Sequence, residues 1–173
     1  KDVAFAEMEK LHLQTGETIH MGILDGTEVV SIEGFESFKS LHTKLYIGRR
    51  APLYCTAVGK AILAFLPEVD REGLIDTLDL VPQTSKTITD KAKLREELER
   101  IRSRGTAFDK GENEDGIACV GAPIFDSSGV VVASISISGP IFRMEEEVMK
   151  KYSDLLKKVV SRISSALGHG LQQ

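Results

Sequence analysis

Residues 116–140 read GIACVGAPIFDSSGVVVASISISGP, and Asp126 carries the only formal charge in this stretch. Two apolar runs, 117–125 and 130–138, lie on either side of the short polar segment DSSG. Short runs rich in valine and isoleucine, separated by aspartate, serine and glycine, are typical of two strands joined by a turn. The sequence therefore predicts an apolar β-hairpin at this position.

Alternation along the strands assigns the side chains of this hairpin to two faces. An even-length turn with Ser127 and Ser128 at its tip predicts that Cys119 lies directly across from Ser136, with Ser138 one step along the diagonal. One face is uniformly apolar, whereas the other is rich in small, weakly polar side chains. The apolar face takes Ala118, Val120, Ile124, Val131, Ile135 and Ile137, and the other takes Ile117, Cys119, Gly121, Phe125, Val132, Ser134, Ser136 and Ser138.

The row of small side chains allows two interpretations. One face of an antiparallel sheet is usually solvated, and serines are compatible with that position. A solvated face, however, generally carries Lys, Glu, Arg or Thr, and this row offers neither charge nor bulk. Its composition therefore favours a covered face, which is either a small-molecule pocket or an interface.

The rest of the chain predicts an α+β domain in which helices flank an antiparallel sheet. The dipeptide Asp25-Gly26 marks a hairpin turn, Thr56 and Asp90 are good N-cap residues, and Gly105 closes the helix that follows Asp90. The expected helices are 3–16, 56–66, 69–77, 90–105 and 144–167, and the expected strands are a hairpin over 18–34, a segment at 44–47, a short strand at 106–109 and the two strands described above.

Length and composition limit the class of protein. The chain has 173 residues, of which 42% are hydrophobic and 28% charged, as expected for one globular domain. No window approaches the roughly 18 consecutive apolar residues of a membrane-spanning helix. The formal charge is −4, from 22 Lys and Arg against 26 Asp and Glu, so we expect no nucleic-acid binding by this segment itself.

Cysteine usage and the start of the chain bear on its cellular context. Cys55 and Cys119 match neither a metal-ligand spacing nor a secreted disulfide framework, and no signal peptide precedes them. We therefore expect a protein of the reducing cytoplasm. The chain begins at Lys1 within an expected helix and without an initiator methionine, so we expect a fragment of a longer protein.

Two features outside the hairpin are compatible with a pocket. The helix after Thr56 begins with N–H groups that lack intrahelical partners, on Ala57, Val58 and Gly59, and such a helix end binds carboxylates well. The alternative is that Thr56 merely caps the helix.

Asp109 is the second feature. It could accept a hydrogen bond from a ligand hydroxyl. The sequence favours a solvated acid instead, because residues 109–115 carry four acids and one lysine.

The same residues carry a resemblance to a known family. The chain resembles, essentially end to end, the C-terminal effector-binding domain of the IclR family of bacterial transcriptional regulators, which include repressors. The resemblance implies a GAF-like α+β domain over 1–173, preceded in the full protein by a winged helix-turn-helix that is absent here. It rests on four blocks in the right order and at the right intervals: TGETIHMGILDG, AVGKAILA, RGTAFDKGENEDGIACVGAPIFD and VVASISISGP.

The resemblance also implies a ligand and its site. Similar members bind small carboxylates, often 2-oxo acids or compounds related to sugar acids, between the sheet and the helix start. It implies no cofactor, no membrane, a homodimer or homotetramer, and DNA binding only through the missing N-terminal domain. Carried over position by position, the implied ligand-binding residues are Ala57, Val58, Asp109, Cys119, Ser136, Ser138, Ser40 and Thr43.

Each implied residue has an expected role. The N–H groups of Ala57 and Val58 receive the carboxylate, while Asp109 and the two serines bond oxo or hydroxyl groups. Cys119 is a small polarisable wall and weak donor. Some relatives have glycine and alanine where this chain has Ala57 and Val58, so we expect a narrower cavity here.

Other functions are less compatible with the sequence. An enzyme with Cys119 as nucleophile needs an adjacent base, and the histidines at 12, 20, 42 and 169 lie in no recognisable motif. Their scatter also argues against a metal site. Tyr54 and Ala61 stand where a phosphate-binding loop needs glycine and Ser or Thr. A dimerisation module without a ligand remains open, because apolar stripes follow both terminal helices.

Overall fold

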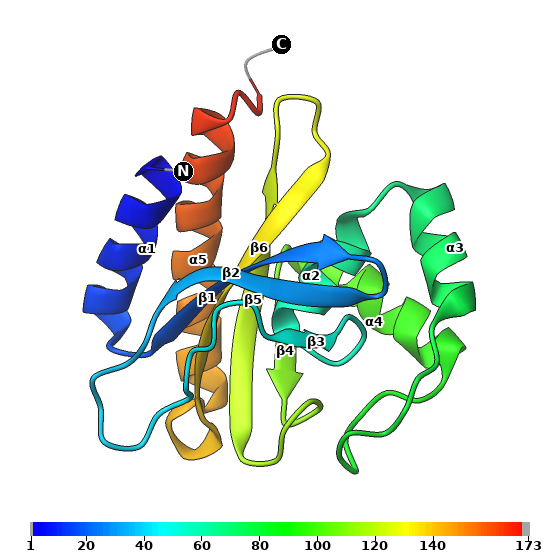
Figure 1. Ribbon diagram of the computed structural model, residues 1–173, viewed down its shortest axis with the longest axis horizontal. Coiled ribbons are helices and arrows are strands. Elements are labelled where there is room, and N and C mark those ends of the chain that lie inside the picture. The colour runs from blue at the N-terminus through cyan, green and yellow to red at the C-terminus, as the bar shows by residue number, and fades with distance from the viewer. Residues whose placement is uncertain (1, 171–173) are drawn as a thin grey trace.

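The computed structural model describes residues 2–170 and confirms the α+β class (Figure 1). Within these residues the strands form one six-stranded antiparallel sheet in the order β3-β2-β1-β6-β5-β4. The strands are β1 Thr18–Asp25, β2 Glu28–Phe35, β3 Arg50–Pro52, β4 Ala107–Lys110, β5 Ile117–Phe125 and β6 Val131–Pro140; the helices are α1 Asp2–Thr15, α2 Ala57–Phe65, α3 Glu68–Thr77, α4 Lys91–Arg104 and α5 Glu146–Ala166, with a 3₁₀ turn at Ile141–Arg143.

The predicted hairpin forms as β5 and β6, but its register differs from the prediction. Cys119 pairs with Ser138, and Gly121 pairs with Ser136. The expected pairing of Cys119 with Ser136 is therefore wrong, although all of these residues lie on the predicted face. The shift by two residues keeps these side chains on their own side of the sheet. The assignment of Val131 to the apolar face is wrong, because beyond the bulge it pairs with Phe125 and packs in the opposite cluster.

The loop between β5 and β6 explains the shift. It is longer than the short even turn assumed from the sequence: the Asp126 N–H donates to the Val130 carbonyl at 2.9 Å, and a bulge lies between Ile124 and Phe125. The Asp126 carboxylate accepts the N–H of Ser128 at 2.8 Å and stabilises the turn from inside. Such side-chain bonds and bulges change a register without any change in the hydrophobic pattern.

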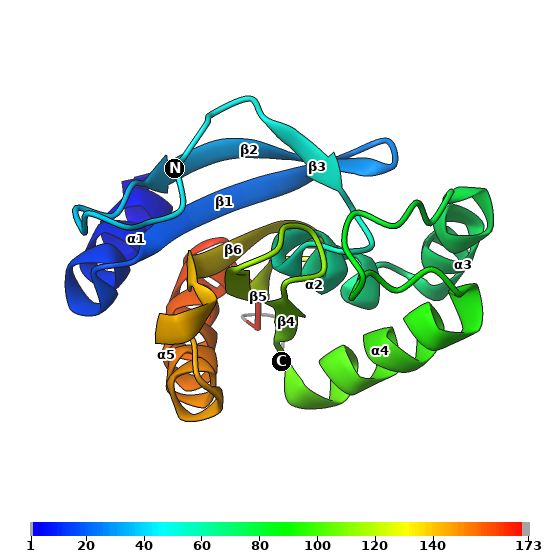
Figure 2. The ribbon, with the colours of Figure 1, turned by 90° about the horizontal axis from the view of Figure 1, so that it is seen from below.

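The two faces of the hairpin pack against different helices, as the alternation predicts. The apolar face joins α5 and α1 in one hydrophobic cluster, and the opposite face joins α2, α3 and α4 in another. Figure 2 shows α5 and α4 on opposite sides of the central strands. Ser134, Ser136 and Ser138 are at most 3% exposed, so the interpretation of their face as covered is confirmed.

Glycine allows α2 to approach the sheet closely. A Cβ at Gly121 would lie 2.5 Å from the carbonyl oxygen of Ala57 and 3.1 Å from the amide nitrogen of Val58. A Cβ at Gly22, on β1, would lie 2.8 Å from Cγ1 of Val58. The small residues of this face therefore have a packing role, because they allow the first turn of α2 to lie directly on the strands.

The predicted strand at 44–47 does not form. Residues 36–49, which we call the strap, run irregularly from β2 to β3, and pairing with β2 begins only at Arg50. The Gly48 N–H donates to the Ser31 carbonyl and the Ser31 N–H donates to the Arg49 carbonyl, at 2.7 and 3.0 Å, so a turn precedes the strand.

Among the described helices, none combines the length and apolar character needed to cross a membrane.

We predict that Gly121→Ala destabilises the fold by about 1–3 kcal/mol, because its methyl group meets backbone atoms that cannot move independently. Gly73→Ala is the matched control, since Gly73 lies on α3 with no heavy atom within 4 Å of the added Cβ. This control should gain up to about 1 kcal/mol from helix propensity. Urea unfolding followed by circular dichroism measures both, and equal effects of the two substitutions would contradict the close approach.

Candidate functional site

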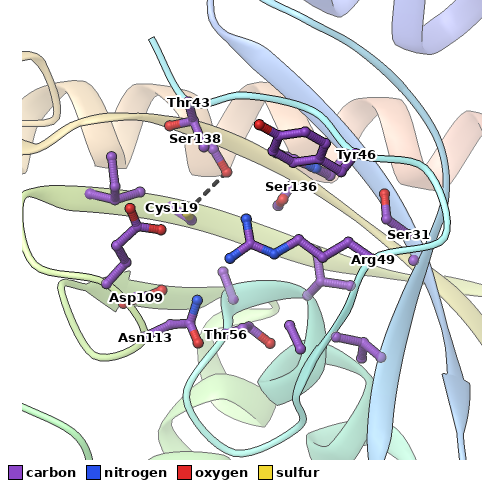
Figure 3. Close-up of a pocket in the computed structure, with 18 of the residues that line it drawn as sticks. Ser31, Thr43, Tyr46, Arg49, Thr56, Asp109, Asn113, Cys119, Ser136 and Ser138 are labelled. Carbon is purple, nitrogen blue, oxygen red and sulfur yellow. Dashed lines mark hydrogen bonds between the residues drawn. The ribbon is translucent and has the colours of Figure 1, made fainter. Parts of the chain in front are cut away.

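A cavity of about 120 Å³ lies between α2, the sheet, the strap and residues 110–116, which we call the acidic loop (Figure 3). A single water needs roughly 10–15 Å³ on this measure, so the cavity has room for a small organic molecule. Every ligand-binding residue implied by the resemblance lines it except Ser40, which is exposed on the strap. The implied residues that line it are Thr43, Ala57, Val58, Asp109, Cys119, Ser136 and Ser138.

The start of α2 forms one wall of the cavity. Thr56 is the N-cap, and its hydroxyl oxygen accepts the N–H of Gly59 at 3.1 Å. The capping interpretation is therefore confirmed for Gly59. The N–H groups of Ala57 and Val58 keep no capping side chain among the described residues, and both residues line the cavity. Polar hydrogens at a helix start carry partial positive charge and favour an anion.

The floor of the cavity is the small-residue face of the sheet. The Ser138 hydroxyl donates to Sγ of Cys119 at 2.9 Å, so the sulfur accepts here rather than donates. Ser136 pairs across the sheet with His20 of β1, and both line the cavity. Ser134 instead donates to the Ala122 carbonyl at 3.0 Å, which gives it a role within the sheet.

Asp109 is buried, and the expectation of a solvated acid is wrong. The residue is 3% exposed, and its carboxylate accepts the N–H of Glu112 at 2.7 Å. Burial raises the pKa of Asp109 to about 6, against the opposing effect of backbone hydrogen bonds and of Lys60. The number of charges in this segment could not reveal the burial, because the Asp109 carboxylate points inward and accepts a backbone N–H of the following turn.

Lys60 is a functional candidate that the sequence reasoning missed. It is fully buried on α2, and its ammonium donates to Glu112 of the acidic loop and to the Phe108 carbonyl, each at 2.6 Å. Glu97 lies 3.4 Å from the same nitrogen. Burial raises the pKa of Glu112 to about 7, against the effect of Lys60. A signal was present, since Lys60 is the only charged residue in the helix AVGKAILAF.

The cysteines are poorly suited to nucleophilic chemistry. Burial raises the pKa of Cys55 to about 12 and also raises the pKa of Cys119. Both are free thiols, and the hydrogen-bond partner of Cys119 is a serine rather than a base. A protonated thiol is a weak nucleophile.

Within residues 2–170, no cluster of three or more His, Cys, Asp or Glu side chains is placed to hold a metal ion.

The strap and the neighbouring strands add lining residues that the sequence reasoning also missed. His20, Ser31, Tyr46 and Arg49 line the cavity, and Figure 3 shows the Arg49 side chain pointing into it. Burial, and then the charge of Arg49, lower the pKa of His20 to about 4. No local pattern marks Tyr46 and Arg49, because the strap has no periodicity and its position depends on contacts with distant segments. His20 and Ser31 lie on the predicted hairpin of β1 and β2, whose faces were not assigned from the sequence.

The sequence is similar to a known family and to characterised regulators. The family model described as "Bacterial transcriptional regulator IclR C-terminal" matches residues 1–165. The chain is 36% identical over 163 residues to the HTH-type transcriptional regulator KdgR of Escherichia coli K12, covering 94% of this chain and 62% of that protein. It therefore spans less than two thirds of the length of this relative.

Solved structures share the fold. The Thermotoga maritima IclR crystal structure superimposes with a TM-score of 0.93 at 43% identity, covering 97% of this chain and 68% of that one. The C-terminal domain of E. coli KdgR gives a TM-score of 0.88 at 35% identity, covering 97% of this chain and 98% of that one. The GAF-like fold implied by the resemblance is thus confirmed.

We predict a specific pH effect of Asp109→Asn. Because its pKa is raised, the Asp109 carboxyl binds its proton more tightly in the folded chain than in the unfolded chain between about pH 4 and pH 6. The contribution of Asp109 to the free energy of unfolding therefore falls as pH rises through this window. Asn cannot titrate but still accepts the Glu112 N–H. Relative to the unaltered chain, the variant should gain roughly 1–3 kcal/mol between pH 4 and pH 7.

Urea unfolding at a series of pH values measures this gain. Asp115→Asn, an exposed acid of the same loop, is the matched control for the loss of one charge. Parallel pH profiles for Asp109→Asn and the unaltered chain would contradict a buried carboxyl at this position.

Proposed function

The chain belongs to the IclR family of bacterial transcriptional regulators, and on this basis we propose that its cavity binds a small carboxylate effector. The observation that carries the proposal is the juxtaposition of the start of α2 with the floor formed by Cys119, Ser136 and Ser138. The family consists of regulators and not enzymes. The effector is an acid of the 2-oxo or sugar-acid type.

The effector carboxylate lies at the start of α2. Its oxygens accept the N–H groups of Ala57 and Val58, which have no capping side chain, and the helix dipole adds roughly half a unit of positive charge at this end. Gly121 places this helix end against the sheet, so the anion is also in reach of the floor.

The floor and Asp109 recognise the rest of the molecule. The hydroxyls of Ser136 and Ser138 can donate to an oxo group or accept from a hydroxyl, and Asp109 bonds a hydroxyl of the ligand. Cys119 provides a small polarisable surface against the carbon chain. This combination of one anion site with short polar groups suits a small oxygen-rich acid.

Effector binding regulates through a difference in affinity between two arrangements of the protein. The acidic loop is suited to this role, because it directly follows Asp109, which lines the cavity, and because its Glu112 accepts a hydrogen bond from Lys60 on α2. The longer protein binds DNA through a winged helix-turn-helix that precedes this domain. It acts in the cytoplasm as a homodimer or homotetramer.

A dimerisation module without a ligand is the second candidate. One observation favours it: α1 buries Met8 and Leu11 but leaves Val3, Phe5 and Leu13 between 44% and 68% exposed. Apolar side chains of this size on one helix are suited to contact a second copy of the chain. The two functions are compatible, since the cavity lies on a different part of the fold.

We predict that Ser138→Ala weakens binding of a stabilising acid by about tenfold, the effect of losing one hydrogen bond to a charged or strongly polar group. Ser40→Ala is the matched control, because Ser40 is exposed outside the cavity. Thermal shift with a panel that includes pyruvate and gluconate identifies a binder, which adds about 2.7 kcal/mol of stability at 100 times its dissociation constant.

Titration of that acid then gives the affinities of the two variants. Asp109→Ala should weaken binding in the same way while leaving the fold intact. Unchanged affinity in both Ser138→Ala and Asp109→Ala would place the site elsewhere. A stable dimer with no response to any acid would favour the dimerisation module.

A further inference from the structure

Arg49 is a cation in the cavity to which the proposed function gives no role. It is the last residue of the strap, it lines the cavity, and Figure 3 shows its guanidinium reaching from the strap toward the floor near Cys119. The same view has Thr56, at the start of α2, on the other side of this guanidinium. Arg49 therefore lies in the region where the α2 start and the sheet face one another.

Two hydrogen bonds fix the backbone of Arg49, so its side chain starts from a defined position. Its carbonyl accepts the N–H of Ser31 at 3.0 Å, and its own N–H donates to the Tyr46 carbonyl at 3.2 Å. The guanidinium carbon lies 6.0 Å from the centre of the Tyr46 ring, at the outer limit of a cation–π contact. These contacts anchor the residue to β2 and leave the charged end of its side chain over the cavity.

The guanidinium has no ion-pair partner among the described residues. No carboxylate oxygen there lies within 4.0 Å of its nitrogens. The neighbouring Arg50 differs, since it forms ion pairs with Asp25 and Glu28 on the outside of the sheet. Arg49 is solvent-exposed at the mouth of the cavity, where its fork of donors is available for bidentate contact with a carboxylate.

The groups around Arg49 leave this contact open to a ligand. His20, Ser31 and Thr43 also line the cavity, and the hydroxyls of Ser31 and Thr43 are buried without a hydrogen-bond partner among the described residues. The charged residues that also line the cavity are Lys44, Asp109 and Glu114. Neither acid is within ion-pair distance of Arg49.

We propose that Arg49 is the counter-ion of the effector carboxylate and determines the preference of the cavity for acids over their neutral analogues. This inference rests on the proposed function, and it adds a charged contact from the strap to the N–H groups of α2. The carboxylate then accepts from the helix start on one side and from the guanidinium on the other. The bound effector thereby joins the strap to α2.

The test compares acids with their amides, using pyruvate with pyruvamide and gluconate with gluconamide in calorimetric titrations. Arg49→Gln should weaken the acid that binds by about 10- to 100-fold, as expected for a charged hydrogen-bonding pair, and should leave the weak affinity of its amide within about threefold. Arg49→Lys keeps the charge but not the bidentate geometry, so it should recover part of the loss. Arg50→Gln is the matched control and should leave acid affinity unchanged.

Salt dependence gives a readout that a purely structural role would not change. Acid affinity of the unaltered chain should fall as sodium chloride rises, and this slope should be smaller in Arg49→Gln. Unaltered acid affinity in Arg49→Gln, or equal losses for acid and amide, would overturn the role of Arg49 while the proposed carboxylate site stands. Failure of the unaltered chain to bind either acid would overturn the proposed function and this inference with it.

Discussion

The first turn of α2 lies against β5 at a distance that only a glycine at position 121 permits, because a Cβ there would meet the backbone of Ala57. This contact explains the composition of the central hairpin. Its apolar face packs on α5, and its small-residue face accepts a helix end together with a cavity. A bulkier strand would push α2 outward and separate its free N–H groups from the serines of the floor. The packing of one helix on one strand therefore creates the site.

A buried charge cluster around Lys60 joins α2 to the acidic loop. An ammonium as deeply buried as that of Lys60 costs several kcal/mol unless it is paired, and here a carboxylate and a carbonyl both accept from it. The partners come from the acidic loop and from the end of β4, so the cluster joins α2 to the segment that carries Asp109. Such a cluster adds little net stability but favours one loop conformation over others. The acidic loop is thus coupled to the helix whose start faces the cavity.

The cavity is enclosed by segments that are far apart in the sequence: the strap, the start of α2, the acidic loop and the central strands (Figure 3). An effector that contacts several of them is stabilised by each and restricts their relative movement. This is the physical requirement for a ligand that shifts the balance between two states of a regulator, since only a contact that differs between the states changes their populations.

The sequence by itself determined the α+β class, the helix caps at Thr56 and Asp90 and the two faces of most of the hairpin, because each of these is encoded in neighbouring residues. Through the family resemblance it also indicated seven of the residues that line the cavity. Only the tertiary structure decided the register of Cys119 with Ser138, the burial of Asp109 and Lys60, the exclusion of Ser40 and the inward position of Arg49. A desolvated charge and an irregular strap are outcomes of contacts between distant segments, and the register follows from the bulge at Ile124 and Phe125 and the hydrogen bonds of the Asp126 loop. Their energies depend on which groups come into contact in the folded chain, and they cannot be obtained from residue type and spacing alone.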